Sequence, residues 1–407
     1  MAITILQTPP DLSPSGNPIC FRVKTTVHGS GDRLSARVLV ESPSDPGVFS
    51  PLPLLNLYPD VNGLADIDIS RLLHDRMSPA LPDIASGAIR QAVGNMVRYK
   101  IVFSEHPSLS APTDVESSVY VAIRARLNAD QIGSIQFYEY IDLCNHYLSL
   151  FPACQETTFD GIHYLYFLDR SVFKPYKVKA TVITRSGQHR DYTIGSFTTT
   201  DRAYSVHIIP VGLRHISFLN DQNDMASYSV WVEDGTGREV GGRVYFTLRS
   251  SVCQYEYFLF ENAMGGMDTL LSSRLKDTLK VDREEYNLST NILSRTTDYT
   301  NTIESGSGYV SKKITEMFKY MMISNNVFLA AAVLLPILLE KGSFTVIDER
   351  SDLYFVNFKY KPANEKDLLN HYETRAVKKV RALLCVGKCQ KLTANSKNIT
   401  AIKNIKL

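Results

Sequence analysis

Val252–Phe260 reads VCQYEYFLF and is followed by Asn262–Asp268, which reads NAMGGMD. The first run is rich in aromatic and β-branched residues, a composition typical of a strand. Gly265 and Gly266 in the second run predict a bend with positive φ, because glycine has no Cβ to oppose that conformation. They do not predict a phosphate-binding loop, since no long helix follows them. A strand, a glycine turn and further strands together predict a small β-rich module built for assembly.

The same module is expected to contain one helix. A polar stretch rich in Thr, Asn and Ser follows the turn, and Gly306–Tyr309 then reads as a glycine-punctuated loop. Ser311 is the candidate N-cap of the helix, with Ser307 as the alternative, and Asn325–Asn326 is its expected end. Between them apolar residues recur with helical spacing and form one stripe, which predicts packing against a core: Val310, Ile314, Met317, Phe318 and Met321.

Two further strand-like segments complete the module. Val327–Leu339 is an apolar run that contains Pro336. It is shorter than the roughly 20 residues that a membrane-spanning helix needs, so we expect a buried strand or hairpin there. Leu353–Tyr360 has the alternating pattern of a final strand.

The N-terminal 250 residues also read as β structure. Short segments in which apolar and polar residues alternate are separated by Gly, Pro and Asn-Gly turn signals, a pattern that favours β-sandwiches. Asp68–His74 is expected to form a short helix or turn, and Glu233–Gly237 to form the turn of a hairpin between the Trp231 strand and Arg243–Leu248. The other expected strands are Ile19–Val23, Arg33–Glu41, Val97–Phe103, Ser118–Arg126, Lys177–Thr184, Tyr204–Ile209 and Tyr228–Val232.

The predicted fold class is therefore mainly β, with tandem β-sandwich-like domains and a small α+β C-terminal module that carries one short amphipathic helix. The predicted boundaries are 1–127 and 128–250 for the two sandwich-like domains, 251–373 for the α+β assembly module and 374–407 for a basic C-terminal tail. A chain of 407 residues is long enough for two to four domains.

Charge is unevenly distributed along the chain. The formal net charge is only +2, but nine Lys and Arg residues and no acid follow Glu373, which leaves a mildly acidic body. Such a tail is either a solvated terminus or an arm that binds an acidic surface or nucleic acid. The N-terminus lacks the basic and apolar regions of a secretory signal, so we expect synthesis in the cytosol with reduced thiols.

The cysteines do not form a recognisable framework. Six are scattered over the chain, and we expect Cys144 and Cys154 to be buried thiols. Cys385 and Cys389 lack a second Cys or His pair at zinc-site spacing, so no metal is expected there.

No constellation in the sequence predicts a reaction. Asp60–Asp68 has oxygen ligands but lacks the terminal bidentate Glu of a calcium loop, so we expect a turn that leads into a strand or short helix. His207 lies on an apolar strand and is expected to be a core or rim histidine. Cys144 lies close to His146, but no third orienting group is apparent. We therefore expect a protein that is not an enzyme, with no catalytic residues, no metal and no cofactor.

Aromatic residues are more informative than ionisable ones. Tyr occurs 22 times, and rigid amphipathic aromatics suit protein interfaces and sugar-stacking surfaces alike. The predicted interface consists of aromatics and glycines of the C-terminal module and cations of the tail: Tyr257, Phe258, Phe260, Gly265, Gly266, Tyr309, Lys378, Lys379 and Arg381.

Several segments resemble virion structural proteins of Bacteroidetes phages and prophage-like elements. Pro14–Val23 resembles their opening strand, in which Gly-Asn-Pro precedes alternating apolar residues. Tyr257–Thr269 is similar to their segment with Phe, Asn, paired Gly, Asp and Thr, although Met267 stands where a larger aromatic is usual. Two further similarities lie at Asp60–Ser70 and in the region from Gly308 to Ala363.

The resemblance implies a non-enzymatic structural protein of a phage tail tip or baseplate, made in the host cytoplasm and located in the virion. Its implied partners are copies of itself, in a ring-forming homo-oligomer, and other virion proteins; neither nucleic acid nor a membrane is expected. The alternative is a glycan- or receptor-binding adhesin module that uses exposed Tyr residues or Trp231. A hydrolase, and a nucleic-acid-binding protein that uses residues 375–407, remain further alternatives.

Overall fold

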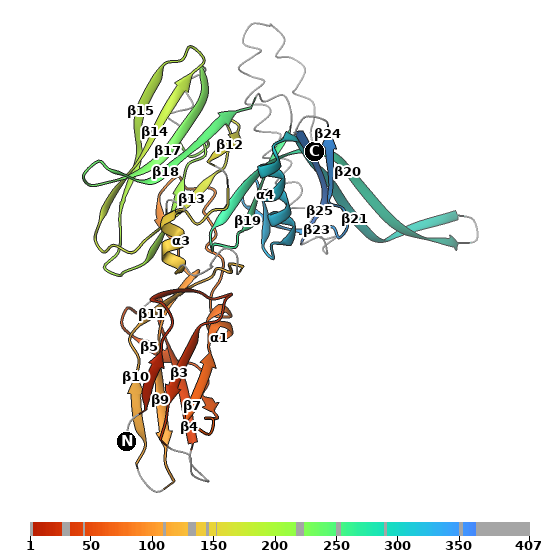
Figure 1. Cartoon of the computed structure of the whole chain (residues 1–407). Helices are drawn as coiled ribbons and strands as arrows, with labels where there is room; N and C mark the ends of the chain where they lie inside the picture. The colour runs from red at the N-terminus through yellow and green to blue at the C-terminus, as the bar shows by residue number, and fades with distance from the viewer. Residues whose placement is uncertain are drawn as a thin grey trace. The chain divides into compact units, whose positions relative to one another are not determined.

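The computed structural model describes residues 3–26, 33–43, 45–108, 111–128, 136–143, 146–151, 153–216, 224–249, 254–288, 291–349 and 353–363. The fold is mainly β, as predicted, and Met1–Ala363 forms one compact unit (Figure 1). The described part contains three helices, and none of them is long and apolar enough to cross a membrane.

The first 127 residues build two sheets around a shared core. One sheet has the order β1-β3-β7, and the other has β2-β11-β9-β4-β5, with β10 on β9 and β6 on β4. Phe21 and Phe103, both fully buried, come from the two opposite sheets and meet edge to face. The bounds are β1 Thr4–Gln7, β2 Leu12–Pro14, β3 Cys20–Lys24, β4 Arg33–Glu41, β5 Phe49–Pro51, β6 Leu55–Leu57, β7 Leu64–Asp68, β9 Met96–His106, β10 Thr113–Glu116 and β11 Tyr120–Ile123. The expected short helix is confirmed as α1, Ser70–His74.

The next pair of sheets is built mostly from residues 154–248. A five-stranded sheet has the order β12-β18-β17-β14-β15, and a three-stranded sheet has β13-β16-β8. The bounds are β8 Arg90–Gln91, β12 Cys154–Thr157, β13 Tyr164–Asp169, β14 Pro175–Thr184, β15 His189–Thr198, β16 Ser205–Pro210, β17 Met225–Asp234 and β18 Glu239–Leu248, with helix α3 at Phe137–Leu143. The predicted hairpin at Glu233–Gly237 is confirmed as the β17–β18 turn. β8 comes from the first 127 residues, so one strand crosses the predicted boundary.

The last strands close into a barrel. β21, β20, β19, β22, β23 and β25 pair in that order, and the ring closes because β21 also pairs with β25. β24 pairs with the first half of β25, on the same edge that β23 occupies along the second half. The bounds are β19 Tyr255–Glu261, β20 Met267–Leu288, β21 Asn291–Val310, β22 Val327–Ala330, β23 Leu334–Leu339, β24 Thr345–Glu349 and β25 Leu353–Pro362.

Helix α4, Lys312–Ile323, packs on this barrel through the predicted apolar stripe. Ser311 is at the N-cap position, as expected, although its side chain makes no capping hydrogen bond, and the helix ends at Ser324, one residue before the expected end. Met317, Phe318 and Met321 are buried, and Phe318 contacts Phe358 of β25. Packing, rather than a side-chain cap, therefore accounts for the position of the helix.

Two predictions for this region need correction. The polar stretch and the expected loop at Gly306–Tyr309 are continuous strands, because β20 and β21 form a hairpin of 22 and 20 residues. The glycines instead mark a register shift between Gly306 and Tyr309 in the pairing of β21 with β25. Val327–Leu339 is a hairpin as predicted, but Leu335 and Leu338 on β23 are exposed rather than buried.

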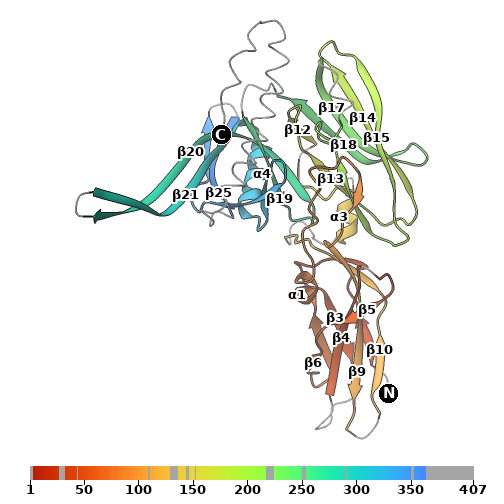
Figure 2. The ribbon, with the colours of Figure 1, turned by 180° about the vertical axis from the view of Figure 1, so that it is seen from behind.

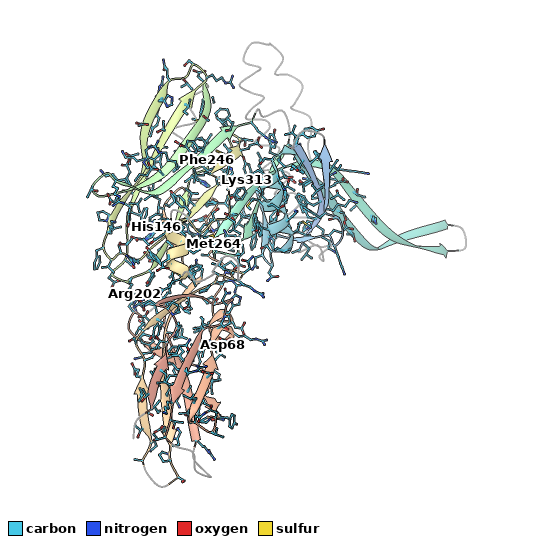
Figure 3. All side chains as sticks on the ribbon, in the orientation of Figure 1. Asp68, His146, Arg202, Phe246, Met264 and Lys313 are labelled. Carbon is cyan, nitrogen blue, oxygen red and sulfur yellow. The ribbon has the colours of Figure 1, made fainter. Side chains whose placement is uncertain are left out.

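One hydrophobic cluster draws on all three of these regions. It includes Ile123 of β11, Tyr166 of β13, Leu259 of β19 and Met264 between β19 and β20. Figure 3 shows Met264 among densely packed side chains. The predicted boundaries at 127/128 and 250/251 stay predictions, and the chain around them shares a core.

Candidate functional site

The segment Asn262–Asp268, here called the junction turn, joins β19 to β20. The side chain of Asn262 closes the turn: its Oδ1 accepts hydrogen bonds from the backbone N–H groups of Met264 at 2.9 Å and Gly266 at 3.2 Å. Gly265 has a φ of +90°, which confirms the predicted bend. The side chain of this buried Asn thereby adds to the backbone hydrogen bonds of the turn, which run from the N–H of Asn262 to Gly266 O at 3.0 Å and from the N–H of Gly265 to Asn262 O at 3.3 Å.

Neither glycine of the junction turn leaves room for a side chain. A Cβ on Gly265 would lie 2.7 Å from the carbonyl oxygen of Arg124, and one on Gly266 would lie 2.3 Å from that of Leu148. These neighbours are backbone atoms, which cannot move as a flexible side chain can. The turn therefore lets two other chain segments approach it directly.

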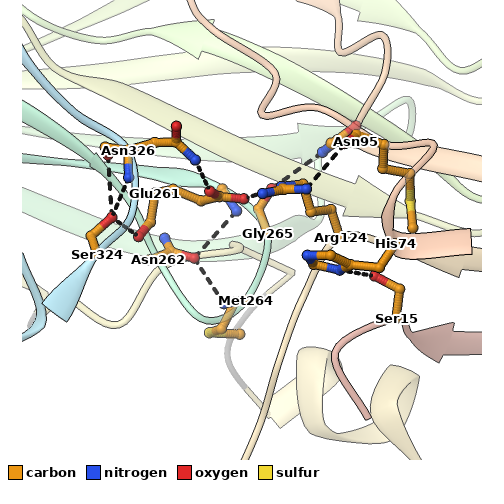
Figure 4. Close-up of polar contacts among 12 residues, drawn as sticks. Ser15, His74, Asn95, Arg124, Glu261, Asn262, Met264, Gly265, Ser324 and Asn326 are labelled. Atoms are coloured by element: carbon orange, nitrogen blue, oxygen red, sulfur yellow. Dashed lines mark hydrogen bonds and ion pairs between the residues drawn. The ribbon is translucent and has the colours of Figure 1, made fainter. Parts of the chain in front are cut away.

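Hydrogen bonds tie the junction turn to the chain next to β9 and β11, two strands of the seven-stranded N-terminal sheet (Figure 4). Asn95 donates through Nδ2 to the carbonyl oxygen of Gly265 at 3.2 Å. The N–H of Arg126 donates to the carbonyl oxygen of Ala263 at 2.8 Å. The turn is thus held by two strand ends of the N-terminal region.

An ion pair next to the turn strengthens the same connection. Arg124 Nε lies 2.5 Å from Glu261 Oε1, and the two side chains are only 16% and 14% exposed. Asn326, just after α4, donates to the other carboxylate oxygen at 2.6 Å. The guanidinium also donates to the carbonyl oxygen of Met77 at 3.0 Å. Both charges are largely removed from water, so their stability in the fold depends on these hydrogen bonds and on each other.

Asp268 closes the other end of the junction turn. Its carboxylate accepts hydrogen bonds from Ser149 Oγ at 2.5 Å and from the backbone N–H of Leu150 at 3.3 Å. Burial raises the pKa of Asp268 to about 6, and these hydrogen bonds oppose that rise. Asn262 donates to the carbonyl oxygen of Leu148 at 2.8 Å, so the same segment is held at both ends.

These contacts change the interpretation of the predicted interface. Tyr257, Phe258 and Phe260 are 5%, 0% and 0% exposed, so their side chains are core residues and offer no surface to a partner. Gly265 and Gly266 are enclosed within this chain. Alternating and continuous apolar patterns do not distinguish an interface strand from a core strand, which explains the error. Of the predicted set, Tyr309 is 54% exposed, and Lys378, Lys379 and Arg381 lie outside the described residues.

The distal part of the β20–β21 hairpin, here called the free ribbon, is the opposite case. β20 pairs with β19 only up to Ser273, and β21 pairs with β25 only from Ile303. From Lys280↔Thr300 to Leu288↔Asn291 the two strands pair with each other. Among the described strands no other pairs with this part, and it runs out beyond its sheet in both views (Figures 1 and 2).

Several other predicted positions are now placed. His207 is a buried core histidine as expected: its Nε2 lies 3.2 Å from Ser205 Oγ, and burial lowers its pKa to about 4. Asp60 forms the expected turn by accepting hydrogen bonds from the N–H groups of Asn62 and Leu64, directly before β7. Cys154 is exposed, contrary to prediction, because it lies on the edge strand β12.

Two predictions remain, the Cys144–His146 pair and the exposed Trp231 surface. Cys144 lies outside the described residues, so its pairing with His146 stays untested. Trp231 is only 5% exposed and lies under the guanidinium of Arg243, 4.0 Å from the ring centroid to Cζ. The adhesin alternative requires an open face of Trp231 for a sugar, and the indole ring offers none.

Sequence reasoning missed the ion pair of Arg124 with Glu261, the role of Asp268 and the free ribbon. Nothing local in the sequence pairs Arg124 with a residue so far along the chain. The free ribbon did leave a signal, because Thr296–Thr302 is rich in Thr, a residue that favours strands.

Comparison with known proteins adds little to this geometry. No family model matches the sequence, and no curated protein matches it. A solved structure, that of dimeric latent PorU from Porphyromonas gingivalis, aligns with 82% of this chain at 11% identity and a TM-score of 0.20. The alignment spans 33% of the length of that protein. At this TM-score the likeness supports no inference about fold or function.

Proposed function

We propose that this chain is a non-enzymatic structural protein that assembles with copies of itself through the free ribbon. The observation that carries the proposal is the pair of unpaired edges on β20 and β21 beyond their contacts with β19 and β25. No other described strand pairs with these edges, so their outward-pointing backbone N–H and C=O groups can pair with a neighbouring strand.

The low stability expected of an isolated two-stranded ribbon also supports pairing with a partner strand. A lone two-stranded hairpin is marginally stable in water, and natural proteins cover or interrupt long free edges. Here Lys280–Leu288 and Asn291–Thr300 pair with each other and with no other described strand, with one register shift at Asp282/Arg283. A ribbon of this length is best explained by a partner strand that pairs with it in the assembled state.

The C-terminal module that carries the ribbon has several exposed apolar side chains. Leu275 and Leu279 on β20 are 48% and 62% exposed. On the barrel, Tyr309, Leu338, Ile347 and Leu353 are also exposed. Single exposed apolar residues are ordinary, but a group on one module supplies the apolar contact that strand pairing alone does not.

The type of assembly follows from the geometry of such a contact. A ribbon on one face that pairs with a different face of the next copy is a heterologous contact, and such contacts close into rings when the rotation permits. Together with the resemblance to virion proteins of Bacteroidetes phages, this supports a component of a tail tip or baseplate. Copies of itself and other virion proteins are its proposed partners, and the virion tail its proposed location.

Two of the described residues with shifted pKa values have structural roles. Asp268 holds the junction turn, and His207 packs in a sandwich core. Burial is the leading cause of the shift in both cases. Each side chain therefore has a structural explanation that requires no reaction.

Mass photometry over a range of protein concentrations, with negative-stain images of the same sample, tests the proposal. The matched variant replaces residues 278–302 with Asn-Gly, which preserves the last barrel-side pair, Asp277↔Ile303, and suits a two-residue hairpin turn. We expect closed oligomers of the full chain and monomers of the variant, and the same melting temperature for both once they are diluted until both are monomeric.

A second variant guards against misfolding of the first. It replaces residues 280–300 with Asn-Gly and retains the pair Leu279↔Asn301, so the ribbon shortens without touching the barrel. A full chain that stays monomeric at every concentration contradicts the proposal, as does a folded shortened variant that assembles as well as the full chain.

A further inference from the structure

Strand β24 leaves a second open edge on the C-terminal module. It pairs with β25 from Thr345↔Asn357 to Glu349↔Leu353, and no other described strand pairs with its far side. An open edge of this kind can accept an added strand, whose main chain then continues the hydrogen bonding of the sheet.

The apolar side chains of β24 suit an added strand better than they suit solvent. Val346 and Ile347 are 38% and 48% exposed. Neighbouring residues of a strand point to opposite faces, so each face of this edge exposes an apolar side chain. The open edge of β15 is different, because it begins with the exposed polar run His189–Asp191 and pairs with β14 across a register shift at Val178/Lys179. Charges and irregular pairing commonly protect an edge, and the apolar part of β24 has neither.

An apolar row on the outer face of the barrel ends at the edge of β24. Ile347 lies opposite Phe355 of β25, and Phe355 lies opposite Tyr309 of β21. The rings of Phe355 and Tyr309 meet edge to face at 6.1 Å between centroids, and Tyr309 is 54% exposed. Val356 points to the opposite face and is fully buried, so the row faces out of the barrel. A strand added to β24 extends this row by one cross-strand contact.

The free ribbon of the same chain cannot reach this edge. β21 pairs with one edge of β25, and β24 pairs with the other. β24 lies along Leu353–Asn357, whereas the ribbon leaves the barrel beyond Ile303↔Tyr360, at the other end of β25. Figures 1 and 2 show the ribbon running away from the barrel. A ribbon that pairs with β24 therefore belongs to a second copy of the chain.

The ribbon offers a matching open edge on β20. β20 pairs with β19 only up to Ser273, and no other described strand pairs with its outer edge beyond that point. Leu279 at the base of the ribbon is 62% exposed, and Lys280, which follows it, is exposed as well. In β24 the two apolar residues are followed by Asp348 and Glu349. The two edges are thus complementary in charge as well as in apolar character.

Strand geometry allows the apolar contact and the charge contact to form together. If Leu279 lies opposite Ile347, a parallel strand places Lys280 opposite Asp348. An antiparallel strand places Lys280 opposite Val346, on the same face as Asp348 and diagonal to it. Directly opposed side chains are about 5 Å apart at Cβ and diagonal ones about 7–8 Å, a distance that a long lysine side chain spans. Both contacts are therefore compatible with either strand direction.

We propose that β24 is the acceptor strand for the free ribbon of a second copy, with Leu279 against Ile347 and Lys280 beside Asp348. This inference rests on the proposed assembly through the free ribbon and names the surface that receives it. Because the ribbon and β24 are different parts of one chain, each copy receives one neighbour and binds the next. That is the heterologous contact from which a closed ring forms.

The test reverses the two charges separately and together, and mass photometry gives the concentration at which half of the chains are assembled. Lys280→Glu and Asp348→Lys each place two like charges at the contact, so each should raise that concentration about fivefold in low salt. The double variant restores opposite charges and should return to within about twofold of the wild type. High salt should bring the single variants closer to the wild type, because it screens exposed charges.

Two control variants account for the change in net charge. Lys24→Glu on β3 and Asp114→Lys on β10 make the same changes at exposed positions of the first sheets. Neither should alter the concentration of half-assembly. The melting temperature of every variant, measured on diluted monomers, should match that of the wild type, which shows that the folds are intact.

Hydrogen exchange of the unmodified chain tests the same contact without any substitution. Outward-pointing backbone amides of Thr345–Ile347 should gain protection when the chain assembles. If the chain assembles through its ribbon but these amides gain none, or if the double variant assembles no better than the single ones, this inference is wrong and the proposed function stands. A chain that stays monomeric at every concentration overturns both.

Discussion

The junction turn and the free ribbon are connected by the first half of β20, yet they differ in what holds them. In the junction turn, Asn262, Gly265 and Asp268 each contact a segment that is distant in sequence. In the free ribbon, pairs such as Lys280↔Thr300 connect the two strands to each other and to no further described strand. One region is satisfied inside the chain, and the other leaves its outer edges open.

This difference indicates which part of the chain is the better candidate for a contact surface. The segment from β19 through the junction turn is rich in aromatic residues and glycine and resembles an interface by composition, but its apolar side chains are buried in the core. The polar segment that follows has no such composition and yet presents open backbone edges. Unsatisfied backbone groups are therefore a better guide to assembly here than aromatic content.

The largest effect is expected from Gly265→Ala in the junction turn. Gly237 in the β17–β18 turn is the matched control, because its φ of +83° is close to the +90° of Gly265 but nothing lies within 4 Å of its would-be Cβ. We expect Gly237→Ala to cost about 1–2 kcal/mol for the left-handed backbone alone. Gly265→Ala should cost well over about 3 kcal/mol, because the new methyl also meets Arg124. Equal losses in urea unfolding would show that the turn is not tightly enclosed.

The next effect is expected from breaking the buried ion pair. Arg124→Met leaves the Glu261 carboxylate buried with Asn326 as its remaining side-chain partner, and should cost about 3 kcal/mol. Replacing both charges, with Arg124→Met and Glu261→Leu, should recover part of that loss. Arg22→Met, in an exposed pair with Asp66, is the control and should have little effect. A double variant less stable than the single one contradicts this account.

A smaller effect, visible in the pH dependence, is expected from Asp268→Asn. The pKa of Asp268 is about 6 when folded and about 3.9 in an unfolded chain. The folded state therefore binds the proton more tightly, and this group's contribution is fully present below pH 4 and lost as the pH rises to about 6. The unfolding free energy of the wild type relative to Asp268→Asn should fall by roughly 2–3 kcal/mol across that window and stay level above it. A flat difference from pH 4 to 7 would rule out a raised pKa.

The smallest effect on stability is expected from shortening the free ribbon. Replacing residues 280–300 with Asn-Gly removes the part of the hairpin that lies beyond the pair Leu279↔Asn301. Because a two-stranded ribbon contributes little on its own, monomer stability should change by less than about 1 kcal/mol. Chemical unfolding at a concentration low enough to keep both proteins monomeric measures this. A loss as large as that of Gly265→Ala would show that the ribbon belongs to the core.

Much of the fold, but little of the candidate site, could be predicted from the sequence. Alternation at Arg33–Glu41 and the helical stripe ending at Met321 predicted real elements, because a strand and a helix each repeat on a short period. The contact of Arg124 with Glu261 spans 137 positions and has no local signature. The exposure of Cys154 likewise depends on its place at a sheet edge, which only the strand order reveals.

Hydrogen–deuterium exchange of the full chain, below and above its assembly concentration, tests the central claim most directly. We expect the backbone amides of Lys280–Leu288 to exchange quickly in the monomer and to become protected on assembly, while those of the junction turn are protected in both states. Ribbon amides with the same protection in both states, or junction-turn amides that gain protection only on assembly, would contradict it.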